Sequence, residues 1–237
     1  RVSVIIPTYN MARYVGMAVR SVLAQSFADF EIIVVDDGST DMTRFEIARI
    51  GDPRIRYIYK ESNSGLGAAR NTGIRAALGD YVALLDADDM WFPSFLERTI
   101  SVLENNSHAG AVYTGCQYMD ADGNPLPTQV CKVVDPHRFH LELWRGNWLS
   151  SCAVVARLQC YRDVGLFDED RRIGGVADYD MWLRMSERYE FVGIPEVLVW
   201  YRRSGNNMSD DVDYMAGALE LVLTKHLGSF NSPFDSW

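Results

Sequence analysis

Apolar runs that end in polar turns constrain the fold of this chain more than any other feature of its sequence. The runs VSVIIP, EIIVV and YVALL are continuous rather than alternating, and each has the length of a β-strand. Strands that are apolar on both sides are typical of a parallel sheet covered by helices. Helical patterns separate these runs along the chain. We therefore predict an α/β fold with a Rossmann-like, mostly parallel central sheet.

Polar motifs stand at the ends of three of these runs: PTYN, DDGSTD and DADD. In parallel α/β sheets, ligands bind at the carboxyl ends of the strands. Because the three motifs would meet at that edge, we predict that they line one crevice. DDGSTD alone is also compatible with a turn and a helix cap. Neither GxGxxG nor GxxxxGK[ST] is present, which argues against a dinucleotide-binding Rossmann domain and a P-loop.

The DADD motif places Asp86, Asp88 and Asp89 directly after an apolar strand. Clustered carboxylates repel one another, and near a core they are costly unless a cation compensates them. The alternative is an acidic turn that caps the helix starting near Pro93. Mg²⁺ and Mn²⁺ prefer oxygen ligands, and Mg²⁺ is often shared between carboxylates and substrate phosphates. The motif indicates a divalent-cation site on Asp88, with Asp86 on the ribose side and Asp89 as a neighbour or helix cap.

Net charge and cysteine content restrict the partners and the compartment. The formal net charge of −9 argues against nucleic acid, since phosphate backbones are bound by basic surfaces. No CxxC spacing and no metal-site histidine accompanies the cysteines, so we expect buried thiols in a reducing, cytoplasmic setting: Cys116, Cys131, Cys152 and Cys160. No apolar run reaches the roughly 18 to 20 residues of a membrane span, and we expect no signal peptide.

Two other residue types have ordinary interpretations. Trp182 falls on the apolar stripe of its helix, so we predict that it packs in the core. The histidines show no catalytic pattern, and surface positions are expected for all of them: His108, His137, His140 and His226.

Five motifs follow one another in a specific order and spacing: VSVIIPTYN, FEIIVVDDGSTD, NSGLGAARNTGI, DYVALLDADD and ADYDMWLRM. With this set, residues 1–205 resemble the inverting family 2 glycosyltransferases, which have the GT-A fold. The resemblance implies a nucleotide-sugar-binding half over residues 1–110 and an acceptor-binding half of the same domain over residues 111–227. A loose tail is expected over residues 228–237.

The resemblance implies roles for individual residues on the donor side. The nucleoside would be held by the end of the first strand and the DDGS turn: Pro7, Tyr9 and Asp37. Arg70 of the AARN segment would lie near the nucleotide. The last Asp of the DxD motif, Asp88, would bind Mn²⁺ or Mg²⁺, and the first, Asp86, would lie near the ribose of the donor.

On the acceptor side, the resemblance places the general base at Asp178, although Asp180 is a close competitor at the same helix start. The chain departs from the family pattern in two places. Ala177 stands where a Glu usually precedes the base. Ser204 stands where a His is common, so one of the two neighbouring arginines would contact the diphosphate instead: Arg202 or Arg203.

These implications predict an inverting, metal-dependent hexosyl- or N-acetylhexosaminyltransferase. The donor would be a nucleotide-diphospho-sugar, most often UDP-linked in such proteins, and the acceptor a hydroxyl group of a glycan or glycolipid. The QxxRW signature of processive synthases is missing, which favours transfer of one sugar. A lipid-linked acceptor would bring the protein to the inner membrane face peripherally.

Two other classes remain open. A nucleotidyltransferase would also use a divalent metal, but it would usually show a Gly-rich, basic N-terminal loop, which PTYNMARY lacks. A non-catalytic module that binds nucleotide-sugar would keep the fold and could lose the base. Asp178 beside Asp86 and Asp88 argues against that module, whereas Ala177 leaves it open.

Overall fold

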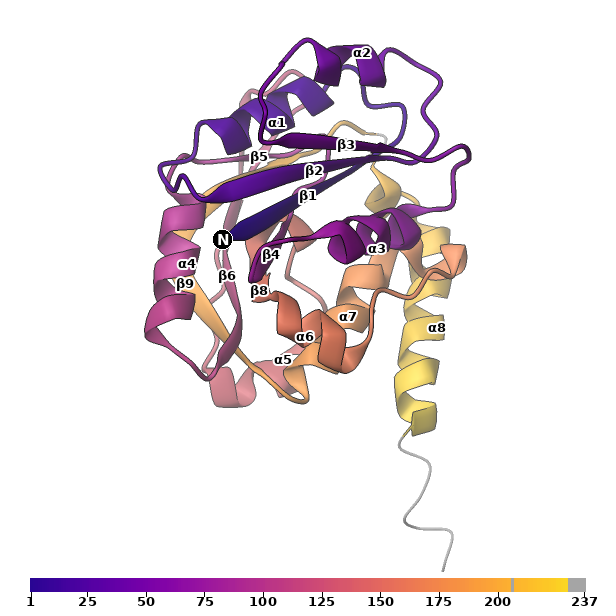
Figure 1. The fold of residues 1–237 in the computed structure, drawn as a ribbon. Coiled ribbons are helices and arrows are strands. Elements are labelled where there is room, and N and C mark those ends of the chain that lie inside the picture. Colours follow the sequence, from indigo (N-terminus) through magenta and orange to yellow (C-terminus); the bar gives the residue numbers. More distant parts are fainter. Residues whose placement is uncertain (206, 230–237) are drawn as a thin grey trace, which may run out of the picture.

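The structure is a computed structural model, which describes residues 1–205 and 207–229 (Figure 1). The strands are β1 (Val2–Thr8), β2 (Phe30–Asp36), β3 (Ile55–Tyr59), β4 (Tyr81–Leu84), β5 (Met90–Trp91), β6 (Ala109–Met119), β7 (Pro125–Val130), β8 (Val154–Arg157) and β9 (Glu190–Arg202). The α-helices are α1 (Val15–Leu23), α2 (Thr43–Ala48), α3 (Leu66–Ala76), α4 (Phe95–Asn105), α5 (Phe139–Leu143), α6 (Leu158–Val164), α7 (Ala177–Ser186) and α8 (Val212–Ser229). Short 3₁₀ segments are η1 (Pro136–Arg138), η2 (Ser151–Ala153), η3 (Arg171–Val176) and η4 (Met208–Asp210).

The first half of the chain builds the parallel part of the sheet. Strands β3, β2, β1 and β4 lie side by side in that order and run in one direction. Val2 of β1 pairs with Phe30 of β2 on one side and with Tyr81 of β4 on the other. Every residue of β1 and β2 is buried, as their continuous apolar runs predict. The polar motifs that follow these strands therefore lie along one edge of the sheet.

The second half of the chain adds antiparallel pairings to this sheet. β8 pairs antiparallel with both β4 and β6, while β9 runs parallel to β6 and antiparallel to β5. The predicted parallel arrangement thus applies to β1 to β4, and the complete sheet is mixed. Apolar continuity does not reveal this difference, because β8, except at its last residue, is as buried as β4, which belongs to the parallel part of the sheet.

Two apolar clusters fill the two faces of the sheet. Val4 and Ile6 of β1 belong to the first cluster, and Ile5 between them belongs to the second, because successive strand residues point to opposite faces. Helices α1 and α4 contribute to the first cluster, and α3, α6 and α7 to the second (Figure 1). Trp182 of α7 is fully buried in the second cluster, which confirms its predicted core position.

Helix α8 contains His226, which is buried rather than exposed. α8 packs along η3, and His226 on this helix is buried with its Nε2 3.0 Å from Oδ1 of Asp180 in α7. The predicted surface position is therefore wrong for His226, because α8 packs along η3 and brings this side chain onto Asp180 of α7. The helix also includes Gly228 and Ser229 of the predicted tail, and the rest of that tail lies outside the described residues.

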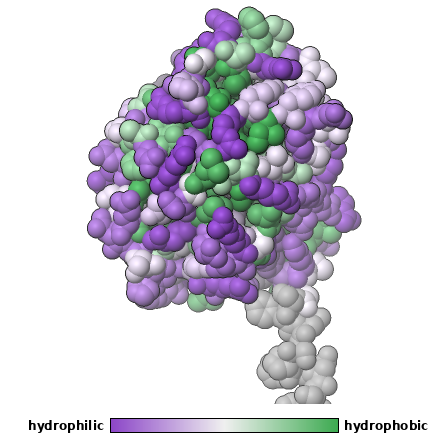
Figure 2. Space-filling view, in the orientation of Figure 1, coloured by the Kyte–Doolittle hydropathy of each residue, from purple (hydrophilic) through white to green (hydrophobic). Residues whose placement is uncertain are grey.

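The predicted burial of the thiols is confirmed for three cysteines and wrong for one. Cys116, Cys152 and Cys160 are buried, but Cys131 is exposed directly after β7. Figure 2 shows hydrophilic residues over most of this face of the molecule, with apolar residues scattered through its middle. Within residues 1–205 and 207–229, no helix has both the length and the apolar character needed to cross a membrane.

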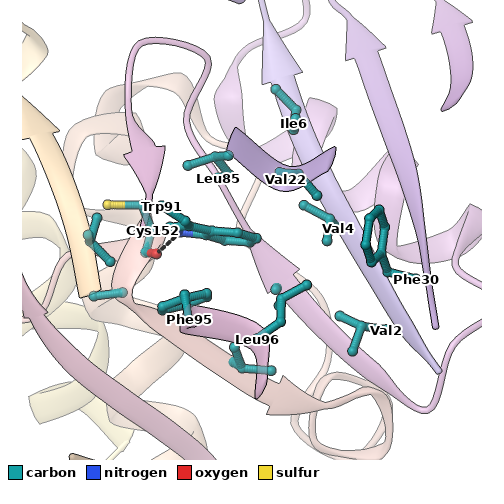
Figure 3. Packing of buried hydrophobic residues seen from close by; sticks show 14 of the residues in the cluster. Val2, Val4, Ile6, Val22, Phe30, Leu85, Trp91, Phe95, Leu96 and Cys152 are labelled. Carbon is teal, nitrogen blue, oxygen red and sulfur yellow. Dashed lines mark hydrogen bonds between the residues drawn. The ribbon is translucent and has the colours of Figure 1, made fainter. Parts of the chain in front are cut away.

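Trp91 of β5 provides a test of packing within the first apolar cluster. Its ring stacks on Phe95 at a centroid distance of 4.3 Å, and its indole Nε1–H donates to the backbone oxygen of Cys152 at 2.7 Å (Figure 3). We expect Trp91→Phe to keep the stacking but leave a buried carbonyl unpaired, at a cost of about 1–3 kcal/mol. A lower midpoint of urea unfolding with an unchanged m-value would show this loss.

The matched control for this substitution is Trp200→Phe. Trp200 also stacks on a phenylalanine, Phe92, but it is only half-buried, and in the described part of the chain its indole makes no hydrogen bond. A smaller loss than for Trp91→Phe is expected. Equal losses for the two variants would mean that the Cys152 hydrogen bond contributes little.

Candidate active site

A cavity of about 1360 Å³ lies along the edge where the parallel strands end. Residues of all three polar motifs line it, which confirms the prediction that these motifs share one crevice: Pro7, Thr8 and Tyr9 of PTYN, Asp37 of DDGSTD, and Asp86 to Asp89 of DADD. Asp178 at the start of α7 lines the same cavity. The cavity thus joins residues from both halves of the chain.

Asp37 stabilises the turn that leads into α3. Its carboxylate accepts hydrogen bonds from the backbone N–H groups of Ser64 at 3.0 Å and Gly65 at 2.8 Å, and its Oδ1 lies 2.7 Å from Lys60 Nζ. Burial alone would raise the pKa of Asp37, but these hydrogen bonds outweigh it and lower the pKa. Asp37 is therefore ionised and largely occupied by internal partners.

The end of β1 forms the other wall of this part of the cavity. Pro7 is buried, and Tyr9 is 44% exposed, so its ring stands at the rim. Between them, the buried hydroxyl of Thr8 has no hydrogen-bond partner in the described part of the chain. An unpaired buried hydroxyl is costly, and a ligand in the cavity would remove this cost.

Arg70, Asp86 and Ser151 form a hydrogen-bonded triangle in the cavity wall. Arg70 Nη2 lies 2.9 Å from Asp86 Oδ1 and 2.8 Å from Ser151 Oγ, and Ser151 Oγ donates to Asp86 Oδ2 at 3.0 Å. Arg70 is 2% exposed. Burial would lower its pKa, but Asp86 and Asp178 outweigh this effect and raise it, so Arg70 stays charged. The sequence interpretation missed Ser151, because its partner Asp86 is 65 positions away along the chain.

Asp88 and Asp89 have different environments. Burial and the nearby Asp86 carboxylate raise the pKa of Asp88, and in the described part of the chain no side chain donates a hydrogen bond to its carboxylate. Asp89 is 2% exposed, and its Oδ1 accepts the backbone N–H of Arg202 at 2.8 Å. Asp89 therefore bonds the end of β9. It is not the cap of α4, because the residue at the N-cap position of that helix is Ser94.

The surroundings of Asp88 fit a divalent cation for which the protein supplies only some of the ligands. In the described part of the chain, no side chain donates a hydrogen bond to the Asp88 carboxylate, and burial and Asp86 outweigh the charge of Arg202 and raise the pKa of Asp88. Among residues 1–205 and 207–229, no group of three or more His, Cys, Asp or Glu side chains could surround a metal alone. Mg²⁺ is commonly bound in such incomplete sites, where substrate phosphates and water supply the remaining ligands.

The two arginines near the end of β9 differ in position. Arg202 is fully buried and does not line the cavity; its guanidinium donates to the backbone oxygens of Asp88 at 2.7 Å and Asp120 at 3.0 Å. Arg203 lines the cavity, and its Nη2 lies 2.5 Å from Asp210 Oδ1. Of these two arginines, only Arg203 is therefore placed to reach a ligand in the cavity.

Asp178 lies in the first turn of α7 and faces the cavity. Its Oδ1 accepts the backbone N–H of Tyr179 at 2.7 Å and lies 3.5 Å from Asn147 Nδ2. Burial raises the pKa of Asp178 to about 6, although Arg70 and the Tyr179 N–H act in the opposite direction. The carboxylate is thus mostly ionised at pH 7 and is a stronger base than an ordinary aspartate.

Asp180, the competitor of Asp178, has a structural position. It is fully buried away from the cavity, and it bonds Arg184 at 2.8 Å, Lys225 at 2.9 Å and His226 at 3.0 Å. These partners outweigh burial and lower its pKa. Asp180 therefore joins α7 to α8 and cannot reach a substrate in the cavity.

The sequence of this chain is similar to those of known glycosyltransferases. Residues 3–126 match the family model described as glycosyl transferase family 2. An uncharacterized glycosyltransferase of Rickettsia conorii, RC0461, is 35% identical over 190 residues, which cover 78% of this chain and 31% of the relative. The chain spans about a third of the length of the first curated relatives that it matches.

Solved structures show the same fold. S. aureus TarS 1–349 in complex with UDP-GlcNAc superimposes with a TM-score of 0.72 at 21% identity, over 96% of this chain and 66% of TarS 1–349. The mannosyltransferase PcManGT from Pyrobaculum calidifontis, in complex with GDP-Man and Mn²⁺, gives 0.73 at 22% identity, over 98% and 66%. These likenesses confirm the predicted GT-A type of α/β fold.

Proposed function

The chain belongs to glycosyl transferase family 2, and we propose that it transfers one hexosyl or N-acetylhexosaminyl group by a single displacement that inverts the anomeric configuration. The donor is a nucleotide-diphospho-sugar, with UDP-sugars favoured, and the acceptor is a hydroxyl group of a glycan or glycolipid. The observation that carries this proposal is one cavity lined both by a candidate base, Asp178, and by Asp88, whose carboxylate accepts no side-chain hydrogen bond within the described residues.

Residues 1–110 are assigned to the donor. The nucleoside lies between Pro7, Tyr9 and the turn that Asp37 stabilises, and the ribose lies towards Asp86 and Arg70. Two structural neighbours were solved with nucleotide-sugars, UDP-GlcNAc and GDP-Man, which supports a donor of this class.

The diphosphate is assigned to the part of the cavity between Asp88 and Arg203. A divalent cation, Mn²⁺ or Mg²⁺, held by Asp88 would neutralise the diphosphate and stabilise the charge of the departing nucleotide. The chain has a net charge of −9, so a positive charge at this point is needed before an anionic donor can approach Asp86 and Asp88.

Residues 111–227 are assigned to the acceptor. Both hydrogen bonds to the Asp178 side chain go to Oδ1, so within the described residues Oδ2 has no partner. Oδ2 is therefore free to take the proton of the acceptor hydroxyl while the hydroxyl oxygen attacks the anomeric carbon. Attack from the face opposite the leaving nucleotide diphosphate inverts the configuration in one step.

Incubation with UDP-GlcNAc, other UDP-sugars and GDP-Man, together with Mn²⁺ and a panel of glycan and glycolipid acceptors, tests this proposal. We expect nucleotide diphosphate release that depends on the acceptor, and a product of inverted configuration by NMR. Release of pyrophosphate would instead indicate a nucleotidyltransferase. Tight donor binding without turnover across the acceptor panel would indicate a non-catalytic module.

The pH dependence of transfer follows from the environment of Asp178. Its pKa is raised to about 6, and only the ionised carboxylate can accept a proton. We expect kcat at saturating donor, acceptor and Mn²⁺ to be constant from pH 7 to 8 and to fall about tenfold per pH unit well below pH 6. Saturating Mn²⁺ keeps Asp88 ionised, so this acid limb reports on the base. A limb near pH 4 would contradict the assigned environment.

A further inference from the structure

The segment from Asn147 to Ser151 contacts both sides of the proposed reaction centre. At one end, Asn147 Nδ2 lies 3.5 Å from Oδ1 of Asp178. At the other end, Ser151 Oγ donates to Asp86 Oδ2 at 3.0 Å and lies 2.8 Å from Arg70 Nη2. Every residue of this segment lines the cavity.

The orientation of the Asn147 amide follows from its own chain segment. Asn147 Oδ1 accepts the backbone N–H of Leu149 at 3.0 Å, and Leu149 is 3% exposed and belongs to the second apolar cluster. This bond directs the donating end of the amide, Nδ2, towards Asp178. The backbone of buried Leu149 therefore holds the side-chain amide of Asn147, although Asn147 itself is exposed.

Asn147 is also the single side chain that contacts the Asp178 carboxylate by a hydrogen bond within residues 1–205 and 207–229. The residue before the base, Ala177, has no polar side-chain atom and is 1% exposed in the core. Since Asn147 and the Tyr179 N–H both bond Oδ1, the carboxylate cannot turn without breaking one of these bonds.

We propose that Asn147 and Ser151 are positioning residues for sugar transfer: Asn147 orients the base so that Asp178 Oδ2 faces the acceptor, and Ser151 orients Asp86 towards the donor. This inference rests on the proposed function. One short segment would then set the geometry on both sides of the anomeric carbon. A misplacement of about 1 Å at such a centre can lower a rate by about 100-fold.

Two charged neighbours, Arg70 and Asp86, also influence the pKa of Asp178. Arg70 of α3 stabilises its ionised form, and Asp86 after β4 destabilises it. On its own helix, Asp180 is fully buried among Arg184, Lys225 and His226. A negative charge at position 147 would therefore act directly on Asp178.

The first test measures the pKa of Asp178 without any substrate. The ¹³C signal of its side-chain carboxyl, assigned by its loss in Asp178→Asn, is followed against pH in the wild type, Asn147→Ala and Asn147→Asp. We expect Asn147→Asp to raise the pKa by about one unit through like-charge repulsion, and Asn147→Ala to raise it less through loss of the donor. The acid limb of kcat should move by the same amounts.

The matched control is Asn105→Asp, which adds the same charge at an exposed position of α4 outside the cavity lining. Its Asp178 pKa should equal that of the wild type. An unchanged pKa in both Asn147 variants would overturn the role of Asn147, even if the wild type is an active transferase. Absence of transfer by the wild type would instead count against the proposed function, while the NMR result would still decide whether Asn147 holds Asp178.

Ser151 has a separate readout. Ser151→Ala removes the hydroxyl that bonds Asp86 Oδ2, so we expect KM for the donor to rise about tenfold while the acid limb stays in place. Asn147→Ala should do the opposite, since it should move the limb and leave KM for the donor within about twofold. If Ser151→Ala leaves the donor KM unchanged, or if both variants lower kcat alone at every pH, the segment is only structural.

Discussion

Replacing Asp178 with Asn is expected to lower kcat for transfer by about 10²–10⁴-fold, which is the usual contribution of a positioned general base. The substitution is nearly isosteric, and the amide oxygen can still accept the N–H of Tyr179 at the start of α7. Its NH₂ group, however, cannot take a proton from the acceptor hydroxyl. Donor binding should change less than kcat, because the nucleoside is assigned to Pro7, Tyr9 and the turn that Asp37 stabilises rather than to Asp178.

The measurement is kcat at saturating substrates together with Kd for the donor from calorimetry. Asp213→Asn is the matched control, since Asp213 also lies in the first turn of a helix, but it is exposed and does not line this cavity. Its kcat should match that of the wild type. Full transfer by Asp178→Asn would remove Asp178 from the reaction and reopen the search for the base.

Sequence patterns predicted the parallel half of the sheet and its polar edge because both depend on local features. Asp86 and Asp88 follow β4 directly, so their place at the strand end comes with the strand itself. The direction of β8 was not predictable in this way. A strand of four residues next to β4 shows the same apolar run in either direction, and its direction depends on the connection from β7 over residues 131–153, which contains only short helical segments.

Positioning contacts were the least predictable part of the candidate site. Asn147 contacts a residue 31 positions away, and Ser151 contacts one 65 positions away. Both lie in a segment without helical or strand periodicity, where no pattern relates a residue to its partner. Arg202 illustrates a different limit of motif resemblance. A motif identifies the position of a side chain, but it does not show that the guanidinium already donates hydrogen bonds to backbone oxygens.

Replacing Asp88 with Asn is expected to lower kcat/KM at a fixed, limiting Mn²⁺ concentration by about 10²–10³-fold. Within residues 1–205 and 207–229, the carboxylate of Asp88 accepts no side-chain hydrogen bond, and its raised pKa shows that burial and Asp86 oppose its charge. A bound cation would relieve both effects, so cation and Asp88 should stabilise each other. An amide removes the charge while it keeps the shape. Asp122→Asn, in the exposed turn between β6 and β7, is the matched control and should behave as the wild type.

Mn²⁺ binding in the presence of UDP separates this effect from a general loss of structure. We expect the wild type to bind Mn²⁺ more tightly with UDP than without it, because the protein offers an incomplete ligand set that the diphosphate oxygens complete. Asp88→Asn should lose this difference while its thermal unfolding midpoint rises or stays constant, since a repelling buried charge has been removed. EDTA should abolish transfer by the wild type, and added Mn²⁺ should restore it. Transfer that persists in EDTA would show that Arg203 or another cationic side chain, rather than a metal on Asp88, neutralises the diphosphate.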